Sequence, residues 1–118
     1  MRTLIALLLA VAGPALADAP EIEAAKAVEN SGRWQFSVTL RHPDSGWEHY
    51  ADAWQVLAPD GQILGIRRLV HPHVTEQPFT RSLSGVIIPD GVSHVFIQAR
   101  CLVDGWAPAR FRVDLTRS

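Results

Sequence analysis

The most regular feature of the chain is an alternation of apolar and polar side chains in RWQFSVTLR, residues 33–41. Trp34, Phe36, Val38 and Leu40 alternate there with polar neighbours. A period of two is typical of a β-strand with one buried face. The segment therefore predicts a half-buried strand.

Six further segments favour strands, because each combines apolar periodicity with turn residues at its ends. They cover about 21–28, 51–57, 62–70, 82–88, 95–103 and 111–115. The first, EIEAAKAVE, also fits a helical turn or two. Seven short strands at this spacing predict an all-β fold, an antiparallel seven-stranded immunoglobulin/fibronectin type III-like β-sandwich. A small closed barrel is the competing architecture.

The connections between these strands are of two kinds. Three are tight turns, NSG at 30–32 and PDG at 59–61 and 89–91. The other three are richer in chemistry and cover 42–50, 71–80 and 104–108. Successive connections of an antiparallel sandwich alternate between its ends. We therefore expect the three richer loops together at one end.

Residues 1–17, MRTLIALLLAVAGPALA, have the pattern of a cleaved signal peptide. Arg2 gives a positive start, an apolar run follows, and cleavage is expected near Ala17. The run is shorter than the roughly 20 residues that span a bilayer, so we expect no stable membrane anchor. A single domain at 18–118, periplasmic or secreted, is the resulting prediction.

Charge and cysteine content exclude some classes of function. The 12 acidic and 11 basic residues are nearly balanced, which gives no electrostatic reason to expect nucleic acid as a partner. Cys101 is the single cysteine, so no internal disulfide forms. It falls on the inward face of its predicted strand, where we expect an inert buried thiol.

The three rich loops predict a binding site, because loops on a rigid scaffold commonly carry function. We expect an unknown protein or small-molecule ligand to be recognised there, without catalysis. Two interpretations fit Trp47 and Trp106 equally well. They form either an aromatic binding platform or caps on the hydrophobic core. The candidate ligand-binding residues are Trp47, His49, Tyr50, Glu76 and Trp106.

Metal binding is the alternative function, with zinc or copper as the possible cofactor. Pro72 stands between His71 and His73 and favours a backbone that turns their side chains apart. The alternative interpretation is that His71 and His73 are loop residues whose side chains form hydrogen bonds with the backbone. The candidate ligands are His49, His71, His73 and Asp104.

No catalytic residue is assigned, since no nucleophile motif occurs. For Glu76 and Arg81 a structural role is also expected. If Phe79 enters the core, the two charges are expected to pair over it and hold the loop.

Two motifs carry a resemblance, GWxHYAD and HPHVxEQPFTRSL. Through them, residues 33–106 resemble a family of small secreted bacterial proteins with no assigned function. The resemblance implies a single exported sandwich domain and no reaction. The family has a His-Gly-Tyr-Gly-Gly-like segment where this chain has Asp104-Gly105-Trp106-Ala107-Pro108. Asp104 thus replaces the family's histidine, which puts a strictly histidine-dependent role in doubt.

Overall fold

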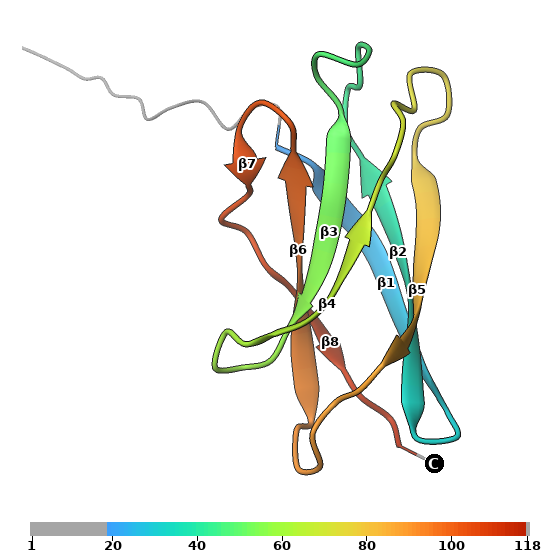
Figure 1. Ribbon diagram of the computed structural model, residues 1–118, viewed down its shortest axis with the longest axis vertical. Helices are drawn as coiled ribbons and strands as arrows, with labels where there is room; N and C mark the ends of the chain where they lie inside the picture. The colour runs from blue at the N-terminus through green and yellow to red at the C-terminus, as the bar shows by residue number, and fades with distance from the viewer. Residues whose placement is uncertain (1–18, 118) are drawn as a thin grey trace, which may run out of the picture.

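The computed structural model describes residues 19–117 (Figure 1). The predicted signal peptide, residues 1–17, lies outside these residues. Within the described range no helix has the length and apolarity needed to cross a membrane.

Within residues 19–117, eight strands form two antiparallel sheets. The first sheet has the order β1-β2-β5, and the second has the order β4-β3-β6-β7, with β8 also paired to β6. The inner faces of the two sheets share one hydrophobic core, so the prediction of an all-β, sandwich-like fold is confirmed. The strands are β1 (Glu21–Asn30), β2 (Arg33–Arg41), β3 (Ala51–Leu57), β4 (Ile63–Arg68), β5 (Phe79–Val86), β6 (His94–Cys101), β7 (Gly105–Trp106) and β8 (Phe111–Asp114).

Two details differ from the predicted strands. The segment 104–108, predicted as a loop, contains the short strand β7, which pairs with β6 just as β8 does. Pro108 lies between them, and without an N–H group it cannot continue the ladder. Strand β5 begins at Phe79, earlier than the predicted start near residue 82.

The alternation in β2 has the predicted consequence. Trp34, Phe36, Val38 and Leu40 are all buried in the core, between exposed or half-buried neighbours. The segment EIEAAKAVEN forms the strand β1, and its half-buried side chains pack against the same core. Residues 21–30 are therefore not helical.

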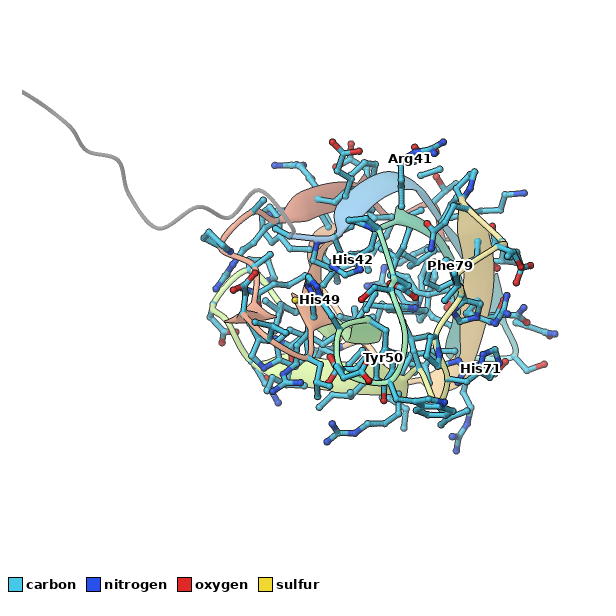
Figure 2. The ribbon with its side chains drawn as sticks, turned by 90° about the horizontal axis from the view of Figure 1, so that it is seen from above. Arg41, His42, His49, Tyr50, His71 and Phe79 are labelled. Atoms are coloured by element: carbon cyan, nitrogen blue, oxygen red, sulfur yellow. The ribbon has the colours of Figure 1, made fainter. Side chains whose placement is uncertain are left out.

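The long loops and the short turns lie at opposite ends of the molecule, as expected (Figure 1). The β1–β2, β3–β4 and β5–β6 turns share one end. We call the other end the loop pole, which consists of residues 42–50, 69–78 and 102–104. Figure 2 looks down on this pole.

Candidate functional site

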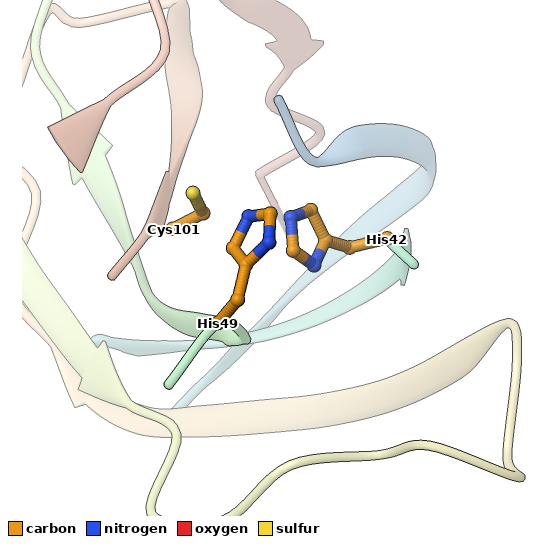
Figure 3. Close-up of side chains that lie close together, drawn as sticks. All are labelled: His42, His49 and Cys101. Atoms are coloured by element: carbon orange, nitrogen blue, oxygen red, sulfur yellow. The ribbon is translucent and has the colours of Figure 1, made fainter. Parts of the chain in front are cut away.

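Three side chains able to bind a metal ion meet at the loop pole: His42, His49 and Cys101 (Figure 3). One ligand atom from each lies within 4.8 Å of the other two. His42 is 1% exposed and Cys101 is 0% exposed. The Nε2 atoms of both histidines are buried, and neither has a hydrogen-bond partner in the described part of the chain. Buried polar atoms without partners are destabilising, and one metal ion would satisfy both nitrogens.

Asp44 fixes the orientation of the His42 ring. His42 directly follows β2, and its Nδ1 lies 2.5 Å from Asp44 Oδ1, with both side chains fully buried. The same carboxylate oxygen accepts the Ala51 N–H at 3.0 Å. Because Nδ1 is engaged by the carboxylate, Nε2 is the nitrogen left for the cluster. A carboxylate behind a histidine in this way commonly orients metal ligands.

A tight turn positions His49. Ser45 N–H donates to His49 O at 3.0 Å, and His49 N–H donates to Gly46 O at 3.2 Å. Gly46 has a φ of 152°, which side chains rarely allow, and an added Cβ would meet the Glu48 carboxylate at 3.0 Å. The turn brings the His49 ring to 4.9 Å from the His42 ring, measured between centroids.

The turn after β6 holds Cys101 beside the histidines. Leu102 N–H donates to Tyr50 O at 2.9 Å, which ties this turn to the residue after His49. Asp104 N–H donates to the Cys101 Sγ at 3.4 Å, and the thiol lies 3.8 Å from Asp104 Oδ2. The surroundings of the sulfur are therefore polar as well as buried.

The spacing within the cluster is close to that of a coordination shell. Zinc bonds of about 2.0–2.3 Å place tetrahedral ligand atoms about 3.3–3.8 Å apart. The atoms of His42, His49 and Cys101 lie within 4.8 Å of one another, so side-chain rotations that shorten these distances by about 1–1.5 Å bring them to this spacing.

The loop HPHVTEQPFT supports His42 from the other side. Gln77 Oε1 accepts the His42 N–H at 2.9 Å, and Gln77 Nε2 donates to His73 O at 2.9 Å. Asp44 Oδ2 accepts the His73 N–H at 2.7 Å. The loop thus fixes both the backbone of His42 and the carboxylate that orients its ring.

The side chains of His71 and His73 are used differently from those of the cluster. Their ring centroids are 4.5 Å apart. His73 Nε2, however, lies 2.8 Å from the Arg81 guanidinium, which donates to it, and its ring stacks on Phe79 at 3.9 Å. His71 is exposed, with Nδ1 3.1 Å from Pro72 O. Figure 2 shows His71 and Phe79 apart from His42 and His49.

The environment of His73 also affects its protonation. Burial lowers the pKa of His73 below its ordinary value, and the positive charges of Arg81 and His71 lower it further. Glu76 and Asp44 act in the opposite direction. The neutral form of His73 is therefore favoured, as its bond from Arg81 requires.

The latch expected around Phe79 is present. Phe79 is buried, and Arg81 lies over its ring at 5.6 Å. Glu76, one of the candidate ligand-binding residues, is 3.4 Å from Arg81.

The candidate aromatic residues fall into two groups. Trp47 is 64% exposed and makes an edge contact with Tyr50 at 5.8 Å. Trp106 lies on β7 and is 36% exposed. Among residues 19–117, no ring contact joins Trp106 to Trp47 or Tyr50. Trp47 does not cap the core, because most of its surface faces solvent.

One sequence interpretation needs correction. Cys101 was expected to be an inert thiol among apolar side chains, whereas it lies beside His42, His49 and Asp104. Its inward direction was predicted correctly. The missed signal was its place at the last position of β6, where the inward face of the strand meets the loop pole.

Comparison with known proteins gives one relationship. No protein-family model matches the chain, and no solved structure is significantly similar to it. A protein from Halomicrobium mukohataei named "Putative lipoprotein" is 41% identical over 80 residues. The aligned stretch is 68% of this chain and 39% of that protein, so the chain spans well under half of the relative's length. The similarity is distant and assigns no family.

Proposed function

We propose that this protein is an exported, non-catalytic binding module that holds a transition-metal ion, zinc or copper(II), at His42, His49 and Cys101. The observation that carries the proposal is the convergence, within 4.8 Å, of one ring nitrogen from each of two histidines and a buried sulfur. Both histidines also have a buried Nε2 atom without a partner among the described residues. Imidazole and thiolate are donors that zinc and copper prefer. Asp44 behind His42 adds the carboxylate support that such ligands commonly have.

Export is supported by the signal-peptide pattern at residues 1–17 and by the name of the Halomicrobium relative. The strand order β1-β2-β5 against β4-β3-β6-β7 supports an immunoglobulin or fibronectin type III kind of sandwich. In such domains, the loops at one end are a frequent place for binding.

Metal titration tests the proposal. Zinc at about 100 times its dissociation constant should raise the free energy of unfolding by about 2.7 kcal/mol, because it binds only the native protein. Cobalt(II) should give a thiolate-to-metal charge-transfer band. Cys101→Ser should remove this band. The matched control is His94→Gln, at the opposite pole, which should keep both effects.

Two results would contradict the proposal. One is an unchanged melting temperature of the wild-type protein across the zinc titration. The other is a cobalt spectrum without thiolate charge transfer, which would show that Cys101 is not a ligand.

The exposed pair Trp47–Tyr50 supports a second candidate function, recognition of a peptide or carbohydrate at the loop pole. Tryptophan fluorescence during titration with soluble oligosaccharides and short peptides measures this binding. Trp47→Ala should abolish the response and change stability by less than about 1 kcal/mol, since the side chain is mostly exposed. A large loss of stability would instead make Trp47 a structural residue.

A further inference from the structure

The turn after Cys101 has a shape that wraps the chain around the sulfur. Its sequence is Cys101-Leu102-Val103-Asp104-Gly105. Asp104 N–H points back at the Sγ at 3.4 Å. Gly105 has a φ of 76°, in the left-handed region that glycine adopts most easily. A metal-bound sulfur at this position would keep the same N–H as a hydrogen-bond donor behind it.

The same turn brings a carboxylate to the sulfur. Asp104 Oδ2 lies 3.8 Å from Sγ and accepts a hydrogen bond from the thiol. Bonds of about 2.3 Å to sulfur and 2.0 Å to oxygen, at a tetrahedral angle, place the two ligand atoms about 3.5 Å apart. The Cys101–Asp104 pair is therefore close to the spacing that a shared ion requires.

Asp104 does not belong to the tight group formed by His42, His49 and Cys101. Its carboxylate must turn towards the histidines to share an ion with them. Asp104 is exposed. Among the described residues, its carboxylate is hydrogen-bonded to the Cys101 thiol. A turn of this exposed side chain therefore breaks one weak hydrogen bond.

We propose that Asp104 is the fourth ligand and closes the shell of His42, His49 and Cys101 around zinc. This inference rests on the proposed function. On binding, the thiol proton passes to water, and Sγ and a carboxylate oxygen both bond to the ion. Two neutral imidazoles, one thiolate and one carboxylate balance the charge of a divalent cation. Monovalent copper(I) would leave the buried site with a net negative charge.

A closed shell has a functional consequence. Catalytic zinc sites keep one position for water or substrate, whereas structural sites use four protein ligands. Four ligands from the β2–β3 and β6–β7 segments leave no such position. The ion would join these two segments of the loop pole and would not activate water.

Asp104→Asn is the direct test, with Asp90→Asn as the matched control. Asp90 is an exposed acid in the turn at the opposite pole, so both variants lose one negative charge. We expect Asp104→Asn to weaken zinc binding by about tenfold or more, because an anionic ligand is replaced by a neutral amide. The control should bind like the wild-type protein. Asp104→Glu, which keeps the carboxylate, should recover part of the affinity.

Cobalt(II) separates this inference from the proposed function. In the wild-type protein we expect both thiolate charge transfer and the intense d–d bands of a four-coordinate ion. Asp104→Asn should keep the charge transfer and change the d–d bands. Absence of charge transfer in the wild-type protein would overturn both proposals. Charge transfer together with equal zinc affinities for Asp104→Asn and Asp90→Asn would overturn the role of Asp104 alone. Wild-type d–d bands of a five- or six-coordinate ion would also overturn it, independently of how the variants fold.

Discussion

His42 with His49, and His71 with His73, form two pairs of imidazoles at the same pole, with ring centroids 4.9 and 4.5 Å apart. In the first pair the buried Nε2 atoms have no partner among the described residues, and a thiol lies beside them. In the second pair, His73 Nε2 accepts a hydrogen bond from Arg81. The distance between the two rings is therefore similar in both pairs, whereas the hydrogen-bond partners of the ring nitrogens differ.

The difference means that His-x-His spacing alone does not tell which ring nitrogens lack a hydrogen-bond partner in this fold. His71-Pro72-His73 lies in a loop that is anchored by Phe79, Arg81 and Gln77. That loop in turn holds His42 through Gln77 and Asp44. The loop with the His71-Pro72-His73 motif thus supports the cluster of His42, His49 and Cys101.

The largest effect is expected from Asp44→Ala, because Asp44 lies between the two pairs. Its loss leaves His42 Nδ1 and the N–H groups of Ala51 and His73 without their acceptor. We expect a loss of about 3–5 kcal/mol in the free energy of unfolding, measured by urea denaturation. Zinc affinity should also fall, on the order of 10–100-fold. An unchanged midpoint would mean that Asp44 does not hold the two loops together.

Next in size is the contrast between His42→Gln and His73→Gln. At a zinc concentration about 100 times the wild-type dissociation constant, the stabilisation of about 2.7 kcal/mol should disappear in His42→Gln. His73→Gln should retain most of it, because His73 Nε2 is already bonded to Arg81. Thermal unfolding with zinc and with a chelator measures both. Equal losses in the two variants would remove the distinction between the pairs.

A smaller effect is expected from pH. Since the pKa of His73 is lowered by burial and by Arg81 and His71, the unfolded chain binds this proton more readily than the native protein. The stability linked to His73 is therefore fully present above a pH of about 6.5 and is lost as pH falls below it. His73→Phe retains an aromatic ring for stacking on Phe79 and removes this titration.

Urea denaturation from pH 8 to pH 5, with a chelator present, measures the dependence. We expect a flatter profile for His73→Phe than for the wild-type protein. His42 and His49 are present in both proteins, so the difference reports on His73. Identical slopes would show that His73 does not titrate in this range.

The smallest effect is expected from His71→Ala. The side chain is exposed, and its Nδ1 contacts the carbonyl of the adjacent Pro72. Stability should change by no more than about 0.5 kcal/mol, and zinc affinity should stay the same. A tenfold loss of zinc affinity, measured by competition with a coloured chelator, would place His71 in the metal site.

Much of the fold followed from local pattern. The alternation at Trp34, Phe36, Val38 and Leu40 predicted the inward face of β2, and the turn residues predicted most of the connections. Pro108 was visible in the sequence, yet the short strand β7 before it was predicted to be part of a loop. Whether the chain returns to the same neighbour after a proline depends on pairing with β6, which is not a local property.

The candidate site was predicted in part. His49 and Asp104 were among the proposed metal ligands, and both lie by Cys101 in the structure. His71 and His73 were proposed for their spacing, and the part taken by Arg81 was not foreseen. Cys101 was excluded because burial was equated with apolar surroundings.

By itself, the sequence determined that this chain is built from antiparallel strands and that its histidine-rich loops share one pole. Both follow from short-range periodicity and from the alternation of hairpin ends. The tertiary structure alone decided which side chains meet, because His42, His49 and Cys101 converge through the register of β3 against β6. At the loop pole that register pairs Ala51 with Cys101, 50 positions later in the chain, and no local pattern encodes it.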